Sequence, residues 1–438
     1  MGLEFWAFIM LLLIIVAIII GIPVAFSLAS LPLIFGFFAI GERVFPMYSL
    51  QGFGVMETYP FVAAPLFIFM GALMERSGIA ENLYNSFYHI FGRLPGGLAI
   101  ATIAMATLFG ACTGIVGAGV ITIGLLALPA MLSRNYDKAL ATGSVMVGGG
   151  LGVMIPPSIM LILYGAATGI SISDLFIASL IPGVLLGILY IIYVYFHALF
   201  RPHIAPPISN EERITGTKLV RMTLISLVPP IFLILAVLGS IFFGIVSPSE
   251  AGAMGVLGSM VLTIIYKKLN LKALTETVTY TLRISTAIIF ICLGGKLFTG
   301  VFISMKGDLG LRAIIEAFNL GPTGVILLMI FIVFILGCVM DWIALIFILT
   351  PVFSPLVKTL GIDPLWFGIL FCSTLEISNM TPPFAYSVFY LKTISPPEVT
   401  MGDMYRGCIP FVLVNCLIPL LLLFFPGLAL WLPSLMAK

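Results

Sequence analysis

The sequence has very little charge. Asp, Glu, Lys and Arg make up 9% of its 438 residues, whereas soluble domains carry roughly 25% charged residues. This composition excludes a soluble protein. The 20 Lys and Arg residues and the 18 Asp and Glu residues leave a net charge of +2 that is spread thinly over the chain. No concentrated basic face is available, so nucleic acid is excluded as a partner.

Motifs for catalysis and metal binding are missing too. The chain has no GxSxG, HExxH or DxxD pattern, so an intramembrane enzyme would lack its nucleophile or metal ligands. It also has no GxxxxGK[ST] sequence, which favours an ion-driven mechanism over an ATP-driven one. The six cysteines show no CxxC spacing and the three histidines have no partner motif, so we interpret both as ordinary residues.

Long apolar runs dominate the sequence, of which 61% is hydrophobic. At about 20 residues per crossing, the chain can pass through a bilayer about a dozen times. The runs lie at about 3–22, 23–41, 58–75, 96–132, 139–167, 174–200, 222–247, 249–266, 281–303, 321–356, 364–391 and 407–432. The first has no basic n-region and no cleavage site, and this indicates a membrane span that is retained.

Two of the runs, 96–132 and 321–356, approach twice the length of one span and are interrupted midway. Each could be two spans or a re-entrant hairpin, and the charge pattern does not separate these readings. With the N-terminus outside, most Lys and Arg residues fall in cytoplasmic segments, so the positive-inside rule predicts this orientation. The polar loop 201–221 lies near the chain midpoint and divides two similar halves.

An internal repeat relates these halves. When Asp137 is aligned with Asp363, Pro156-Pro157 falls on Pro382-Pro383 and Tyr164 falls on Tyr390. In the predicted topology the first long run starts inside and the second outside, so the repeats are inverted. Inverted repeats are typical of secondary transporters, in which a midplane site is exposed alternately to the two sides.

The repeated Pro-Pro pairs lie inside apolar runs. In the first copy, residues 148–158 add four glycines, and we do not expect a regular helix there. Broken backbone in hydrocarbon is costly unless it lines a cavity or binds a ligand. Its carbonyls suit a small cation, and half-helix N-termini suit an anion. The alternative is that Pro-Pro merely kinks a helix.

The second copy carries polar side chains where the first has glycine, namely Glu376, Ser378, Asn379 and Thr381. Intramembrane charges tend to be functional, and here they are Lys296, Asp341 and Glu376. Whether these three are functional or structural stays open. Separately, the spacing in Ser247-Pro-Ser-Glu250 predicts a capping box that starts a helix.

Taken in order, these segments resemble the large membrane subunit of tripartite ATP-independent periplasmic (TRAP) transporters, the DctM type. No single motif is diagnostic, but the resemblance covers essentially the whole chain. The matching segments in the first half are Pro65-Leu-Phe-Ile-Phe-Met-Gly71, Ile155-Pro-Pro-Ser158, Ser171-Ile-Ser-Asp-Leu-Phe176 and Ile181-Pro-Gly183. Those in the second half include Ser247-Pro-Ser-Glu-Ala251, Leu349-Thr-Pro351, Gly361-Ile-Asp-Pro364, Thr381-Pro-Pro383 and Phe425-Pro-Gly-Leu-Ala-Leu-Trp-Leu-Pro433.

The resemblance implies an all-α polytopic membrane protein with inverted repeats, two re-entrant helical hairpins and two broken helices, similar to elevator-type ion transporters. The expected organisation is N-terminal scaffold spans (1–57), repeat 1 (58–200, hairpin 96–132, broken helix 139–167), a cytoplasmic loop (201–221), central scaffold spans (222–280) and repeat 2 (281–438, hairpin 321–356, broken helix 364–391).

The resemblance also implies a function. The chain would be the large permease of a sodium symporter in the bacterial inner membrane that imports a small organic acid. Its partners would be a small DctQ-type membrane subunit and a DctP-type periplasmic binding protein that delivers the substrate. A stand-alone sodium/carboxylate symporter without a binding protein is the alternative.

Two sodium sites are implied where each hairpin tip meets the break in the following helix. On this sequence the first would use Thr113, Gly114, Ile115, Gly152, Ile155 and Ser158, and the second would use Gly337, Ser378, Thr381 and Phe384. The family often has Ser at the position of Ile115 and Gly at that of Ser378. We expect an anionic substrate to be held by Ser158, Asp341, Asn379 and Thr381.

Overall fold

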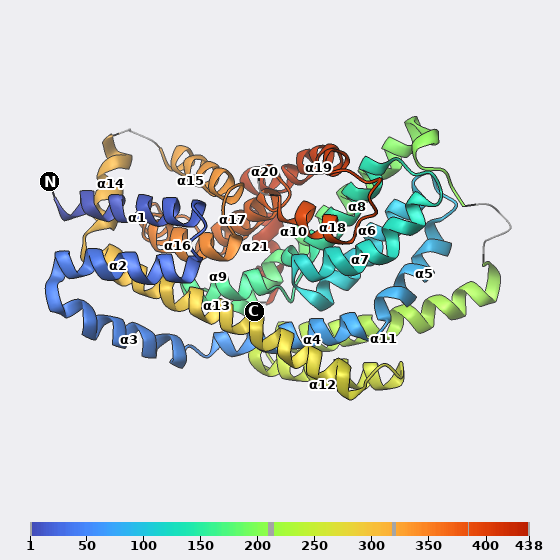
Figure 1. The fold of residues 1–438 in the computed structure, drawn as a ribbon, viewed down its shortest axis with the longest axis horizontal. Helices are drawn as coiled ribbons and strands as arrows, with labels where there is room; N and C mark the ends of the chain where they lie inside the picture. The colour runs from blue at the N-terminus through green and yellow to red at the C-terminus, as the bar shows by residue number, and fades with distance from the viewer. Residues whose placement is uncertain (1, 209–213, 318–320, 384, 437–438) are drawn as a thin grey trace.

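The computed structural model describes residues 2–208, 214–317, 321–383 and 385–436, and all regular structure in these residues is helical. Eight helical segments in the described part of the chain are long and apolar enough to cross a membrane. Most helices run along the long axis of the molecule in Figure 1. An all-α membrane protein is therefore confirmed.

The N-terminal helices form one edge of the molecule. They are α1 (Leu3–Ile19), α2 (Val24–Ile40), α3 (Val44–Glu57), α4 (Pro60–Arg76) and α5 (Ile79–Phe91), with the 3-10 helix η1 (Gly41–Arg43) before α3. α4 and α5 are bent by 62° at Ser77-Gly78. Gly78 has a positive φ of 77°, which glycine adopts without strain, so the chain can turn sharply there.

The next helices form the first pair and the first broken helix. α6 (Gly97–Thr113) and α7 (Val116–Leu132) both pack against α8 (Lys138–Met154), which continues after a break into α9 (Ile159–Thr168). α10 (Ile172–Phe200) then runs to the 3-10 helix η2 (Pro202–Ile204). The loop after η2 is tied to α5, since the Ile208 N–H donates to the Gly92 carbonyl at 2.9 Å.

Three central helices pack on the N-terminal group: α11 (Gly216–Phe242), α12 (Pro248–Ile265) and α13 (Leu271–Ser304). The capping box that starts α12 is confirmed. The Glu250 carboxylate accepts from the Ser247 N–H at 2.7 Å, and the Glu250 N–H donates to Ser247 Oγ at 3.4 Å. α13 lies beside α2, α3 and α4.

The last third of the chain contains the second pair and the second broken helix. After α14 (Gly307–Ala317), the pair is α15 (Pro322–Gly337) and α16 (Trp342–Thr359), and the broken helix is α17 (Pro364–Ser378) with α18 (Tyr386–Ile394). The chain ends with α19 (Met401–Asn415), α20 (Leu417–Phe424) and α21 (Gly427–Met436).

One expectation from the sequence is wrong. The glycines of residues 148–152 are helical, because α8 continues to Met154 and the break is confined to Ile155–Ser158. Packing is the reason. A Cβ atom on Gly149 would lie 2.6 Å from the Val120 backbone nitrogen, and one on Gly152 would lie 3.0 Å from the Gly110 Cα atom. The glycines therefore let α6 and α7 approach α8 closely, and this packing outweighs their weak helix propensity.

The helices fall into two groups in space. In Figure 1, α3, α4, α11 and α12 lie along the lower edge, whereas α15, α19 and α8 lie along the upper edge. α4 and α13 are where the groups meet, because α4 packs against α6 and α9 and α13 packs against α16. Both helix pairs therefore contact the group formed by the N-terminal and central helices.

Candidate functional site

The first break leaves backbone oxygens without helical donors. Residue 156 is a proline and has no N–H to offer the Gly152 carbonyl four residues earlier. Pro157 likewise offers none to Val153, whose carbonyl accepts instead from the Ser158 hydroxyl. Ser158 Oγ also accepts from the Leu161 N–H and so starts α9. The Gly152 carbonyl therefore has no helical partner.

The turn between α6 and α7 reaches this break. Gly114 ends α6 with φ +63°, and a Cβ atom there would lie 2.9 Å from the Pro157 carbonyl oxygen. Thr113, the preceding residue, is 4% exposed, and its hydroxyl has no hydrogen-bond partner among the described residues. On the other side of the turn, a Cβ atom on Gly71 of α4 would lie 2.7 Å from the Thr113 carbonyl oxygen.

The second break has the same layout. α15 ends at Gly337, where a Cβ atom would lie 2.2 Å from Ser378 Oγ at the end of α17. The Ser378 hydroxyl donates to the Leu375 carbonyl at 2.6 Å, and the Thr381 hydroxyl donates to the Ile377 carbonyl at 2.7 Å. Both hydroxyls are thus already bonded to the end of α17. Further along, Ala385 has a φ of +40° before α18 begins.

One buried carboxyl group and one buried amide group lie beside the second break. Glu376 is fully buried, and among the described residues its carboxylate oxygens make no hydrogen bond of regular geometry, although the Asn379 side chain lies close to them. Its Oε1 lies against α8, because a Cβ atom on Gly150 would be 2.4 Å away. Asn379 is 2% exposed, and its Nδ2 is also without a partner there. Glu376 therefore connects the two broken helices.

Of the two remaining intramembrane charges, one lies in the turn of the second pair and the other lies on a neighbouring helix. Asp341 is half-buried and is the residue before α16. Lys296 is half-buried on α13, next to Gly295, where a Cβ atom would lie 2.5 Å from Cβ of Phe347 on α16. α13 thus carries Lys296 close to the second pair.

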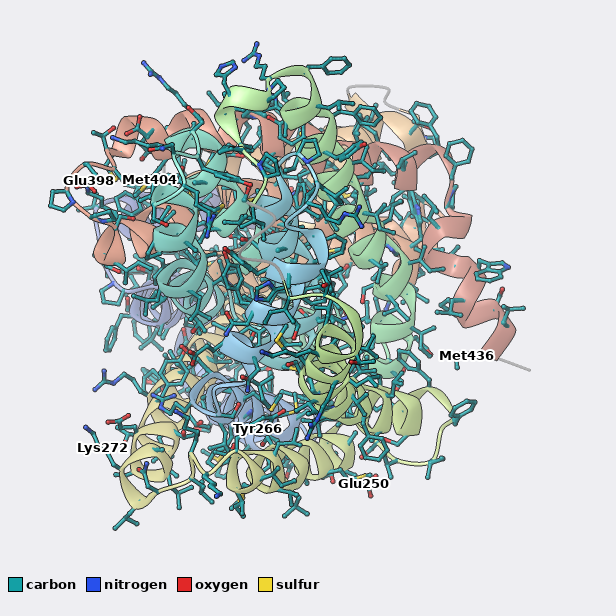
Figure 2. The ribbon with its side chains drawn as sticks, turned by 90° about the vertical axis from the view of Figure 1, so that its right-hand side faces the viewer. Glu250, Tyr266, Lys272, Glu398, Met404 and Met436 are labelled. Atoms are coloured by element: carbon teal, nitrogen blue, oxygen red, sulfur yellow. The ribbon has the colours of Figure 1, made fainter. Side chains whose placement is uncertain are left out.

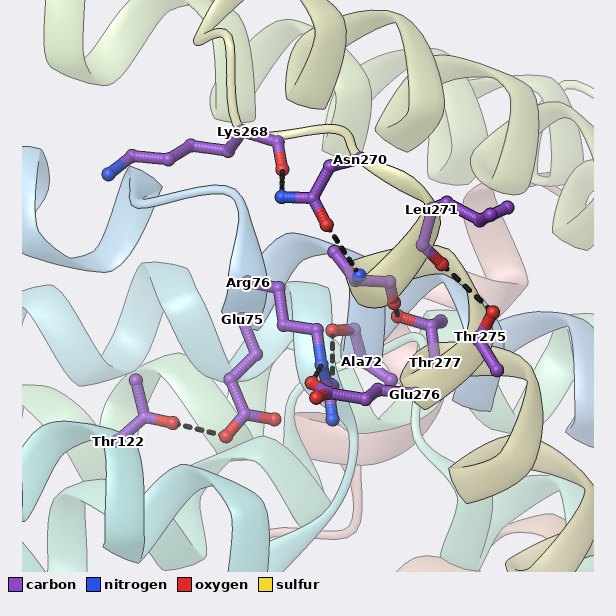
Figure 3. Close-up of polar contacts among 11 residues, drawn as sticks. Ala72, Glu75, Arg76, Thr122, Lys268, Asn270, Leu271, Thr275, Glu276 and Thr277 are labelled. Carbon is purple, nitrogen blue, oxygen red and sulfur yellow. Dashed lines mark hydrogen bonds and ion pairs between the residues drawn. The ribbon is translucent and has the colours of Figure 1, made fainter.

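Sequence reasoning missed a polar connection between the two groups of helices, which Figure 3 shows. The Thr122 hydroxyl of α7 donates to Oε1 of Glu75 on α4 at 2.6 Å. The next residue, Arg76, pairs with Glu276 of α13 through Nε and Oε2 at 3.5 Å. Its Nη1 also donates to the Ala72 carbonyl at 3.0 Å. Glu75 was hard to identify because it follows an apolar run and resembles an ordinary charge at a helix end.

The structure brings together most of the residues predicted for each sodium site. Thr113 and Gly114 lie against the break that contains Ile155 and Ser158, and Ile115 follows in extended conformation. Gly337 contacts Ser378, with Thr381 one turn away. Phe384 lies outside the described residues. Of the predicted substrate residues, Asn379 and Thr381 share the second break, Ser158 belongs to the first, and Asp341 is in the α15–α16 turn.

Residues 11–428 match the family described as "Tripartite ATP-independent periplasmic transporter, DctM component". The chain is 34% identical to the ectoine/5-hydroxyectoine TRAP transporter large permease UehC of Ruegeria pomeroyi, over 85% of this chain and 86% of that protein. It is 33% identical to the ectoine TRAP large permease TeaC of Halomonas elongata, over 95% and 96%. It is 29% identical to the C4-dicarboxylate TRAP large permease DctM of Pseudomonas aeruginosa, over 88% and 89%.

Two solved transporter structures share the fold. The YdaH transporter of Alcanivorax borkumensis superposes with a TM-score of 0.65 at 14% identity, covering 89% of each chain. MtrF of Neisseria gonorrhoeae superposes with a TM-score of 0.61 at 13% identity, covering 88% of this chain and 85% of that one. At such identities the similarity concerns the fold alone.

Proposed function

Because this chain belongs to the DctM-component family of tripartite ATP-independent periplasmic transporters, we propose that it imports a small organic acid in symport with sodium. It is a transporter permease of the inner membrane and not an enzyme. Curated relatives are named for ectoine and for C4-dicarboxylates. Both are small carboxylates, and this supports a carboxylate as the substrate of this chain.

The proposed mechanism is an elevator. The two helix pairs act as re-entrant hairpins and move with the broken helices against α2–α4 and α11–α13. α6 and α7 have 17 residues each, about 26 Å at 1.5 Å per residue, which is short for a hydrocarbon core of roughly 30 Å. Their length supports a pair that enters and leaves on the same side. The inverted repeat supports exposure of one site to each side in turn.

Sodium would bind where each hairpin tip meets its break. The observation that carries this proposal is the buried, unpartnered Thr113 hydroxyl next to the first break, where the Gly152 carbonyl lacks a helical donor. Hydroxyl and carbonyl oxygens are ligands that suit a small hard cation. At the second break the Ser378 and Thr381 hydroxyls donate their protons to α17, so their oxygen lone pairs, like the backbone carbonyls there, can still face a cation.

The substrate would bind beside the second break. Asn379 and Thr381 provide an amide and a hydroxyl there, and Asp341 lies at the start of the neighbouring α16. We propose that Ser158 contributes from the first break. Bound sodium offsets the charge of the anion. A membrane potential supplies about 2.3 kcal/mol per charge per 100 mV, so entry of two sodium ions with a monoanion can be driven without ATP.

Two partners complete the proposal: a small membrane subunit of the DctQ type and a periplasmic binding protein of the DctP type. The test is uptake of radiolabelled organic acids, including ectoine and C4-dicarboxylates, into proteoliposomes that hold this chain and its small subunit. We expect uptake to require both the binding protein and an inward sodium gradient. Sodium-driven uptake without the binding protein would support the stand-alone symporter instead.

A single substitution tests the first sodium site. Thr113→Val keeps the shape of the side chain but removes the hydroxyl oxygen. We expect the sodium concentration for half-maximal uptake to rise on the order of tenfold, since a hydrogen-bonding or ligating oxygen to a charge is lost. An unchanged sodium dependence would remove Thr113 from the site. Thr359→Val, at an exposed helix end, is the matched control.

A further inference from the structure

A polar cavity lies apart from both breaks, where α8, α10 and α19 meet. Its volume is about 220 Å³. It is bordered by the start of α8, the end of α10, η2 and the middle of α19, and it is partly open to the outside. Its polar lining consists of Asp137, Tyr193, His197, Arg201 and Arg406. Met404, labelled in Figure 2, marks the part of α19 that borders it.

Helix periodicity brings the lining together. Tyr193 and His197 are four residues apart and share one face of α10, and Arg201 follows directly after the last residue of that helix. The Phe411 ring of α19 packs against Tyr193, with ring centroids 4.9 Å apart. α19 also approaches the start of α8 closely, because a Cβ atom on Gly407 would lie 2.2 Å from the Ala139 carbonyl oxygen. The cavity is therefore part of the packed fold.

The cavity has excess positive charge. Arg201 and Arg406 are exposed, and the ion pair found among the described residues joins Arg76 to Glu276 instead. Asp137 is the one carboxylate in the lining, and it is occupied as the cap of α8, accepting from the Leu140 N–H at 3.0 Å. Nearby, the Asp403 carboxylate accepts from the Thr400 N–H at 2.9 Å. The Asp137 carboxylate keeps its negative charge and offsets the positive end of the α8 dipole, so the lining holds two guanidinium charges against one carboxylate charge.

Apolar side chains flank the cavity on the outside. Phe196 and Phe200 of α10 are 49% and 79% exposed, and Ile409 and Leu413 of α19 are 55% and 65% exposed. In a membrane protein such surfaces face lipid tails. Arg201 and Arg406 belong to the predicted cytoplasmic segments, so the cavity lies at the cytoplasmic interface with hydrocarbon beside it.

We propose that this cavity binds the phosphate headgroup of an anionic phospholipid from the cytoplasmic leaflet, with the acyl chains lying along α10 and α19. Basic pockets between membrane helices on the cytoplasmic side suit such headgroups. The guanidinium groups of Arg201 and Arg406 donate to the phosphate oxygens in the bidentate geometry that arginine favours. The lipid would hold α8, α10 and α19 together at their cytoplasmic ends.

The test is native mass spectrometry of the full chain in detergent, titrated with phosphatidylglycerol, phosphatidylethanolamine or inorganic phosphate. Phosphatidylglycerol should bind more tightly than phosphatidylethanolamine. Arg201→Gln and Arg406→Gln should each weaken phosphatidylglycerol binding about fivefold, as expected for one basic residue near an anionic lipid. Arg221→Gln, which removes an exposed arginine at the start of α11, should leave binding unchanged.

Several outcomes would overturn the proposal. Equal phosphatidylglycerol affinity in all four proteins would place the bound lipid elsewhere. Displacement of the lipid by millimolar inorganic phosphate would indicate a site for a soluble anion. Thermal melting of each variant checks folding, and Arg406→Lys provides a second measurement if Arg406→Gln melts early. Arg406→Lys keeps the charge but loses the fork, so its affinity should fall between those of the parent and the Gln variant.

Discussion

The turn of each helix pair, here called its tip, contacts the neighbouring break in a different way. At the first, the contact is between backbones: Gly114 lies against Pro157, and Gly110 lies against Gly152. At the second, a side chain takes part, since Gly337 lies against the hydroxymethyl group of Ser378. At the first break a Cβ atom at Gly114 or Gly152 would meet backbone atoms, whereas the second break adds a buried asparagine and a buried carboxylate. The two copies thus keep the same contact between tip and break, although one makes it with backbone atoms and the other with a side chain.

The largest expected effect on stability is at the first break, where the contact is between backbones. Gly114→Ala places a Cβ atom 2.9 Å from the Pro157 oxygen at φ +63°, and we expect it to cost about 2–4 kcal/mol of stability. Gly169→Ala is the matched control, because φ is +77° and nothing lies within 4 Å of its Cβ position. Its cost should be about 1–2 kcal/mol from backbone strain alone. Thermal denaturation measures the loss of stability in each variant. Similar losses in the two variants would show that the tip does not touch the break.

At the second break, we expect one substitution to compensate for another. Gly337→Ala should cost about 1–3 kcal/mol, because its methyl group overlaps Ser378. Ser378→Gly removes that obstacle, so the double variant should recover most of the lost stability and of the sodium-driven uptake. A double-mutant cycle on melting temperature measures the recovery. Additive losses would contradict the contact between tip and break.

A smaller effect compares how each hairpin is held by the neighbouring helices. The first is held by the Thr122–Glu75 hydrogen bond, and the second packs through Gly295 and Phe347. Thr122→Val should weaken the contact of α7 with α4 by about 1 kcal/mol. Introduced cysteines on α7 should then react faster with a soluble thiol reagent. Thr107→Val is the control, since its hydroxyl donates to the Ile103 carbonyl within α6, and an equal acceleration there would refute the specific role of Glu75.

The smallest effect concerns the link between the copies. Gly150→Ala meets only the end of the Glu376 side chain, so we expect a loss below about 1 kcal/mol. In a Glu376→Ala background this loss should vanish, because the obstructing carboxylate is gone. The melting temperatures of the two single variants and of the double variant test whether the loss vanishes. A loss that persists in the double variant would mean that Glu376 does not pack on α8.

Strong local signals predicted a large part of the fold. Proline at 156–157 and 382–383 located both breaks, and Ser247 with Glu250 located the start of α12, because these residues act on their own backbone. The glycines before Pro156 led to the wrong prediction that residues 148–152 are not helical, because tight packing outweighs their weak helix propensity. α3 was missed, because Gln51, Gly52 and Gly54 dilute its hydropathy.

Contacts between distant segments could not be predicted. Glu75 and Thr122 are 47 residues apart, and nothing in either segment shows that α4 lies beside α7. The same holds for Glu376 and Gly150, which the sequence treats as parts of separate halves. The contact of each tip with its break was expected only because the family resemblance supplied that pairing. Local chemistry thus locates the elements, and tertiary packing decides which polar groups meet.

The contact between Gly337 and Ser378 also constrains how this chain can change over generations. An alanine at 337 is blocked while serine occupies 378, whereas glycine at 378 removes the obstacle. The order of two mutations therefore matters, because the path that begins at 337 passes through a variant destabilised by about 1–3 kcal/mol and the path that begins at 378 avoids that overlap. A chain that first acquires glycine at 378 can then accept a larger residue at 337, in the turn of the second helix pair.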